Sequence, residues 1–172
     1  MCVNLVDPIT SKQSESQLSL PASCSPLQHQ VAGHFGFLQT SDGFILKPVQ
    51  SPPRGEREHN FFRRIFSPTC GDDLNSDEQE LRTLLPHYRG SLSHADMVYI
   101  RMDNLAFGVA CPAVGDFKIG RRTCDPEASR DIIERKRLKY RDVEEVGFQL
   151  IGMRVFDEVT RSFRHLNKVC EI

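Results

Sequence analysis

The sequence predicts an α+β fold, because strand-like and helix-like segments follow one another without a regular strand–helix–strand alternation. Two apolar runs flank an Asp-Gly turn in "FGFLQTSDGFILKPVQ". Two later segments carry apolar residues at helical spacing, and two strand-like runs come last. A chain of 172 residues fits one domain, or part of a larger one.

Composition excludes several classes of protein. Apolar residues make up 39% and charged residues 26%, as in ordinary globular domains. The net charge of −1 gives no reason to expect a nucleic-acid partner, and no apolar run is long enough to predict a membrane span. The start of the chain does not match a signal peptide. The six cysteines form no CxxC pair or zinc-finger spacing, which is typical of reduced thiols in an intracellular protein.

The amino-terminal region divides into a tail and a hairpin. Residues 1–28 are rich in Ser, Gln and Pro, and we expect them to form a disordered tail. Phe35 and Phe37 before the turn, with Phe44 and Leu46 after it, predict a β-hairpin. The run "QSPPRG" ends the second strand.

Two amphipathic helices are predicted next. Apolar residues three and four positions apart indicate a helix over residues 56–66. A second helix over residues 76–86 begins at Ser76, a candidate N-cap with Gln79 three residues later, and ends at Pro86.

The later part of the chain alternates strands with a basic helix. Residues 96–105 and 111–120 have strand patterns. A helix is expected from Asp125-Pro126, with Pro at its first position. The run "GFQLIGMRVFDEVTRSFRHLN" then predicts a second hairpin.

Lys47 and Glu58 form the first candidate for chemistry. Lys47 follows a strand-interior Leu, and Glu58 comes eleven residues later at the start of the first helix. The plain interpretation is a solvated strand-end lysine and a glutamate that the helix dipole favours. The alternative is a strand lysine that holds nucleotide phosphates, positioned by a helix glutamate.

Asp116 and Lys118, in "CPAVGDFKIG", form the second candidate. Because strand side chains alternate, both should face one side while Phe117 anchors the other. A surface ion pair is one interpretation. A site for a polyanion is the other, since Arg121 and Arg122 follow and a basic helix comes next. That helix contributes Arg135, Lys136 and Lys139, which could be a solvated face or part of a phosphate pocket.

These residues resemble the inositol polyphosphate kinase family. "PAVGDFKIG" is similar to its PxxxDxKxG signature, and "RRTCDPEAS" to the continuation of that signature. The wider similarity runs from "QVAGH" through "DGFILKPVQSPPRGEREHNFF" to "DVEEVGFQLIGMRVF", and is strongest to the multikinase branch. It covers about residues 29–158.

The resemblance implies a role for each candidate residue. Lys47 would hold the ATP phosphates and Glu58 would position it, while Asp103 and Leu105 in the hinge strand would contact adenine mainly through backbone groups. Asp116 would bind the ribose hydroxyls. Lys118 would contact the inositol phosphate and steer the transferred group. Arg135, Lys136 and Lys139 would belong to the substrate-binding helix.

The resemblance also implies an organisation and departures from it. Residues 1–28 would be the tail, 29–105 the N-lobe antiparallel sheet with its helices and the hinge, and 106–172 the start of the C-lobe. Relative to the family pattern, the sequence lacks the C-terminal half with its second, metal-binding Asp, so no metal ligand is predicted. Ile132 replaces a substrate-contacting Lys, and Gly115 a larger apolar residue.

The implied function is ATP-dependent phosphoryl transfer to hydroxyls of inositol tris- and tetrakisphosphates, with ATP and Mg²⁺ as cofactors. The alternatives are an inactive chain that binds ATP or inositol phosphates, and an interaction scaffold. We expect a monomer located in nucleus and cytoplasm.

Overall fold

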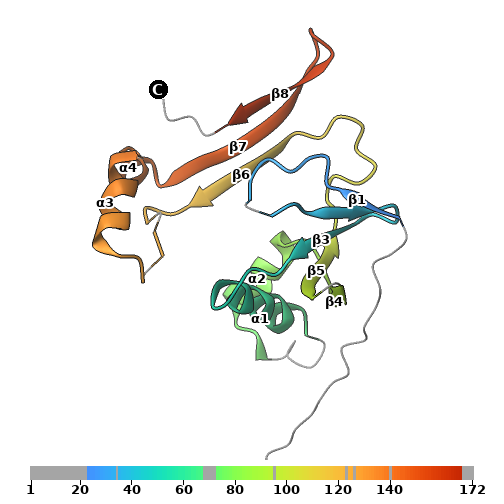
Figure 1. Cartoon of the computed structure of the whole chain (residues 1–172), viewed down its shortest axis with the longest axis horizontal. Coiled ribbons are helices and arrows are strands. Elements are labelled where there is room, and N and C mark those ends of the chain that lie inside the picture. Colours follow the sequence, from blue (N-terminus) through green and yellow to red (C-terminus); the bar gives the residue numbers. More distant parts are fainter. Residues whose placement is uncertain are drawn as a thin grey trace, which may run out of the picture.

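The computed structural model describes residues 23–33, 35–67, 73–94, 96–122, 124–125, 127–139 and 141–167. It contains two antiparallel sheets with separate helices, as Figure 1 shows. This α+β arrangement confirms the predicted fold class. In the described residues, no helix is both long and apolar enough to cross a membrane.

The first sheet has five strands in the order β1-β2-β3-β5-β4. The strands are β1 (Cys24–Pro26), β2 (Leu38–Thr40), β3 (Phe44–Pro48), β4 (Tyr88–His94) and β5 (Met97–Asp103). The predicted hairpin is formed by β2 and β3, although β2 begins after the two phenylalanines expected in it. At the turn, Gly43 has a φ of +88° and lies against the ring of Phe107, so only glycine fits there without strain.

Strand β1 corrects the predicted tail. Cys24 pairs with Thr40 and Pro26 with Leu38, so the sheet extends into a segment that was expected to be disordered. The pairing is non-local, and the local composition of residues 23–28 does not reveal it. Residues 1–22 of the predicted tail lie outside the described part of the chain.

Helices α1 (Arg54–Phe66) and α2 (Ser76–Leu84) lie together beside this sheet (Figure 1). The core is formed by Phe62 from α1 with Ile100 and Met102 from β5. The predicted N-cap of α2 is wrong by one residue: Asn75 caps the helix and forms the capping box with Glu78.

The second sheet has the order β6-β7-β8. Its strands are β6 (Val114–Ile119), β7 (Phe148–Asp157) and β8 (Ser162–Asn167), so the predicted second hairpin is confirmed. Helices α3 (Arg130–Lys139) and α4 (Val143–Val146) lie between β6 and β7 in the sequence. Helix α3 begins later than predicted, and Pro126 lies outside the described residues.

The amino-terminal segment joins the two sheets. Arg154 of β7 is 9% exposed, and its guanidinium carbon lies 3.2 Å from the ring centroid of Phe163. Its Nη1 is 2.6 Å from Nδ1 of His29, which must accept this hydrogen bond because guanidinium only donates. Gly152 allows the backbone of Val31 to cross β7, since a Cβ there would lie 2.3 Å from the Val31 carbonyl oxygen. The second sheet is therefore held to residues 29–31 by a part-buried hydrogen bond and a close approach of the backbone.

Candidate functional site

The structure brings Lys47 and Glu58 together. Lys47 projects from β3 and Glu58 from α1, and their side chains form an ion pair. The two side chains are 22% and 27% exposed, so the pair is partly shielded from water. The Lys47 Nζ also lies 5.6 Å from the ring centroid of Phe37. A positioned ammonium at this place can neutralise phosphate charge.

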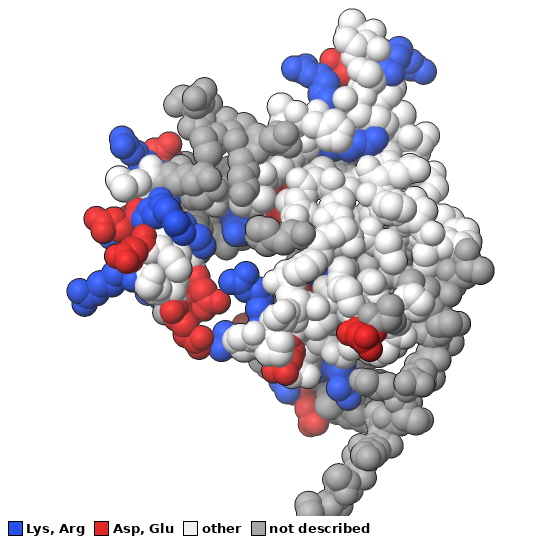
Figure 2. Space-filling view, viewed as in Figure 1, with Lys and Arg blue, Asp and Glu red and all other residues white. Residues whose placement is uncertain are grey.

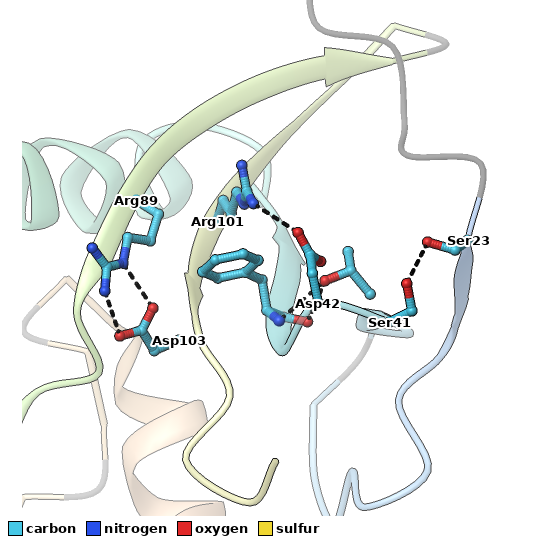
Figure 3. A network of polar contacts seen from close by, with 8 residues as sticks. Ser23, Ser41, Asp42, Arg89, Arg101 and Asp103 are labelled. Atoms are coloured by element: carbon cyan, nitrogen blue, oxygen red, sulfur yellow. Dashed lines mark hydrogen bonds and ion pairs between the residues drawn. The ribbon is translucent and has the colours of Figure 1, made fainter. Parts of the chain in front are cut away.

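The end of β5 is fixed by a second ion pair. Nε and Nη2 of Arg89 on β4 donate to the two carboxylate oxygens of Asp103 at 2.8 and 3.0 Å, as Figure 3 shows. This bidentate hydrogen bonding lowers the pKa of Asp103 and raises that of Arg89. The Asp103 N–H donates to the carbonyl of His87 at 3.0 Å. The side chain of Asp103 is therefore engaged within the sheet.

The backbone after β5 leaves one donor available. Asn104 donates its N–H to the Gly43 carbonyl at 2.9 Å, and Ala106 donates to the Asn104 side chain at 3.0 Å. Between them, the Leu105 N–H has no partner among the described residues, and the Leu105 side chain is 72% exposed. This segment can offer a main-chain hydrogen bond and an apolar surface to a flat heterocycle.

Arg101 stabilises the same part of the sheet, and no local feature of the sequence indicated this role. Its guanidinium carbon lies 3.9 Å from the ring centroid of Phe44, and its Nη2 donates to Asp42 at 3.3 Å (Figure 3). These contacts join β5 to the β2–β3 turn. The turn and the end of β5 thus form one connected polar network.

Asp116 and Lys118 lie on β6. A register shift between Asp116 and Phe117 bends the pairing with β7. The predicted apolar anchor is only partial, because Phe117 is 44% exposed and covers Gly115. Neither Asp116 nor Lys118 forms an ion pair within the described ranges. Lys118 is exposed and Asp116 half-buried, so both have capacity to bind a ligand.

A cleft of about 510 Å³ lies between the start of α1 and the segment that leads into α3. Arg54 and Arg57 line one side, and Ile132 and Lys136 the other. Nη2 of Arg54 lies 3.9 Å from Oδ2 of Asp125. Nη2 of Arg57 lies 3.0 Å from Oε1 of Glu127. These two ion pairs connect α1 to the segment before α3.

The two cleft arginines on α1 were not among the predicted site residues. Both lie in the first turn of the helix, where the dipole disfavours cations, and this misplacement is the signal that could have identified them. Of the predicted substrate residues, Lys136 lines the cleft while Arg135 is exposed outside its lining. The backbone of Lys139 belongs to α3, but its side chain lies outside the described part. Lys47, Asp116 and Lys118 do not line this cleft.

The described residues contain no preformed metal-binding site. Among them no group of three or more His, Cys, Asp or Glu side chains is arranged to hold a metal ion. Mg²⁺ in nucleotide sites is usually held by one or two carboxylates together with substrate phosphates. We therefore assign no metal ligand among the residues that the structure describes.

Comparison with known proteins first identifies the fold. It is shared with the crystal structure of inositol phosphate multikinase Ipk2 from S. cerevisiae, in complex with ADP and Mn²⁺. The TM-score is 0.53 at 22% sequence identity, over 74% of this chain and 50% of that chain. The molecule thus has the fold of a multikinase of this type.

Sequence comparison then identifies the family. Residues 99–171 match the family model described as Inositol polyphosphate kinase. The inositol polyphosphate multikinases of Rattus norvegicus and Homo sapiens are 38% and 35% identical, over 87% and 92% of this chain. The chain is thus similar to the inositol polyphosphate kinase family, and its resemblance to the multikinase branch is confirmed. It spans 39% and 40% of the length of these two relatives.

Proposed function

We propose that the protein is an ATP-dependent inositol polyphosphate kinase that transfers the γ-phosphoryl group of ATP to hydroxyls of inositol tris- and tetrakisphosphates. The observation that carries this proposal is the Lys47–Glu58 ion pair between β3 and α1. It appears in a chain whose relatives are inositol polyphosphate multikinases. In phosphoryl transfer, the protein acts mainly by positioning its substrates and neutralising their charge.

The nucleotide would lie along the end of β5. Leu105 would donate its free N–H to adenine, and the Arg89–Asp103 pair would hold the strand in place. Lys47 would neutralise phosphate charge while Glu58 fixes the position of its ammonium. Asp116 would accept hydrogen bonds from the ribose hydroxyls, which its half-buried carboxylate can do.

The inositol phosphate would be bound by cationic groups from separate elements. Lys118 on β6 would contact a substrate phosphate and steer the transferred group. Arg54, Arg57 and Lys136 would add positive charge from the cleft, the two arginines once their ion pairs with Asp125 and Glu127 open. Magnesium would accompany ATP and supply charge neutralisation between its phosphates.

One observation favours the second candidate function, in which the chain binds ATP or inositol phosphates without turnover. Ile132 lines the cleft at a position where the family resemblance implies a lysine. An apolar side chain there removes one phosphate contact, and with it part of the transition-state stabilisation.

Calorimetric titration separates binding from scaffolding. ATP and inositol 1,4,5-trisphosphate should each bind the 172-residue chain, and Lys118→Ala should weaken the inositol phosphate about tenfold, or 1.4 kcal/mol, while ATP affinity changes less. The matched control is Arg63→Ala, which removes an exposed cation from the last turn of α1. Equal affinity of wild type and Lys118→Ala for the inositol phosphate would show that the role given to Lys118 is wrong.

A further inference from the structure

A second pocket lies on the side of α3 that bears Ile133 and Arg137, whereas the cleft contacts Ile132 and Lys136. Its volume is about 600 Å³. The walls come from the segment after β6, from α3 and from α4. They include Arg121, Arg122, Cys124, Ile133, Arg137 and Glu144. Figure 2 shows Lys, Arg, Asp and Glu side chains gathered over the α3 and α4 end of the molecule. None of the roles proposed above uses this pocket.

The charges around the pocket do not cancel. Nε of Arg137 lies 2.9 Å from Oε1 of Glu144, so these two groups neutralise each other. Asp125, which the pocket shares with the cleft, pairs with Arg54. Arg121 and Arg122 form no ion pair or hydrogen bond with the other described residues. Two guanidinium groups are therefore left to bind anions from solution.

A backbone hydrogen bond fixes the position of the segment that carries Arg121 and Arg122. Gly120 has a φ of +116°, and its N–H donates to the carbonyl of Gly147 at 2.7 Å. Gly147 itself ends α4 in the left-handed conformation, with a φ of +82°. The segment that carries Arg121 and Arg122 is thus hydrogen-bonded, through Gly120 at its start, to the carboxyl end of α4.

We propose that this pocket binds a small anion with two or more phosphate groups, at a site separate from the cleft. Adjacent arginines suit such a ligand, because each guanidinium can donate two parallel hydrogen bonds to a phosphate. Ile133 supplies an apolar wall for the carbon skeleton between the phosphates. The proposal does not rest on catalysis, since it uses none of Lys47, Asp116 or Lys118.

The alkylation rate of Cys124 reports directly on ligand binding, because its half-buried side chain lines the pocket. Alkylation of Cys124 by N-ethylmaleimide is followed by peptide mass spectrometry in the full chain, with exposed Cys111 as internal control. The probes are inorganic pyrophosphate and inositol 1,4,5-trisphosphate. At about four times Kd, a bound probe should slow Cys124 alkylation about fivefold and leave Cys111 unchanged.

Variants assign the effect to the pocket. Arg121→Glu with Arg122→Glu should abolish protection of Cys124. Arg63→Glu with Arg161→Glu, which makes the same change in net charge on exposed residues elsewhere, should keep it. Lys118→Ala should keep it too, which separates this site from the proposed catalytic one. Circular dichroism checks that each variant is folded.

The outcomes are distinct. Protection by pyrophosphate alone supports a site for a diphosphate group, and protection by the inositol phosphate alone supports recognition of the ring with its phosphates. Cys124 alkylation unchanged by both probes would overturn the proposal. So would protection that survives reversal of both arginine charges, or protection that is lost in Lys118→Ala.

Discussion

The Lys47 ammonium on β3 and the Glu58 carboxylate on α1 form an ion pair across the boundary between the sheet and its helix. The pair couples the position of a cation on the sheet to the position of α1. The same helix carries Arg54 and Arg57 into the cleft. The placement of α1 therefore determines both the orientation of Lys47 and the position of the two arginines in the cleft.

Glu58→Gln should lower ATP affinity. The amide keeps the shape of the side chain but removes the charge that orients Lys47, so we expect Kd for ATP to rise about tenfold, or 1.4 kcal/mol. Calorimetry measures this, with Glu80→Gln on the exposed face of α2 as matched control. An ATP affinity that is the same in wild type and Glu58→Gln would contradict the role of the pair.

The Arg89–Asp103 pair predicts a pH dependence. Because the Asp103 pKa is lowered on folding from its ordinary value of 3.8, its carboxylate stabilises the fold above pH 3.8, and this contribution is lost as pH falls through the lower folded pKa. The unfolding midpoint of wild type should therefore drop more steeply below pH 3.8 than that of Asp103→Asn. If the unfolding midpoints of wild type and Asp103→Asn fall equally with pH, the Arg89–Asp103 pair does not contribute this stability.

His29 predicts a second pH dependence near neutrality. Burial, and then the charge of Arg154, lower the pKa of His29 below its ordinary 6.5. The unfolded chain binds this proton more readily, so stability should be complete above pH 6.5 and decrease as pH falls below it. Thermal unfolding from pH 8 to 5 checks this. The decrease of the unfolding midpoint with falling pH should be smaller in His29→Gln than in wild type. It should be unchanged in His94→Gln, which alters an exposed histidine of β4.

Gly55→Ala should destabilise the protein. Gly55 is buried in the first turn of α1, and a Cβ there would lie 1.9 Å from the carbonyl oxygen of Gln50, a backbone atom that cannot move aside like a side chain. We expect a loss of about 2–3 kcal/mol in the free energy of unfolding. Urea denaturation measures it, with Gly36→Ala as control because a Cβ there meets no atom within 4 Å. An equal loss of unfolding free energy in Gly55→Ala and Gly36→Ala would argue against the close approach of Gly55 to the Gln50 backbone.

Much of the fold was predictable because its signals are local. The Asp-Gly turn identified β2 and β3, and the spacing of phenylalanines identified α1. Strand β4, with Gly90 and few apolar residues, was not predicted, since its conformation depends on pairing with β5. Strand β1 escaped prediction for the same reason.

The site was predictable to a smaller extent. The pairing of Lys47 with Glu58 was one of two interpretations of the residues and was also implied by the family resemblance, and the structure brings the two side chains into contact. The engagement of Asp103 by Arg89 was not predicted, because it joins neighbouring strands across a bulge in their register. The pocket at Arg121 depends on where α4 ends, which the sequence pattern did not reveal.

The most direct test is transfer of labelled γ-phosphate from ATP to inositol 1,4,5-trisphosphate by the 172-residue chain with Mg²⁺, resolved by anion-exchange chromatography. The proposed function predicts label in a higher inositol phosphate, lost in both Lys47→Ala and Lys118→Ala. Absence of transfer from a folded chain that still binds both substrates would contradict kinase activity of this chain and support binding without turnover.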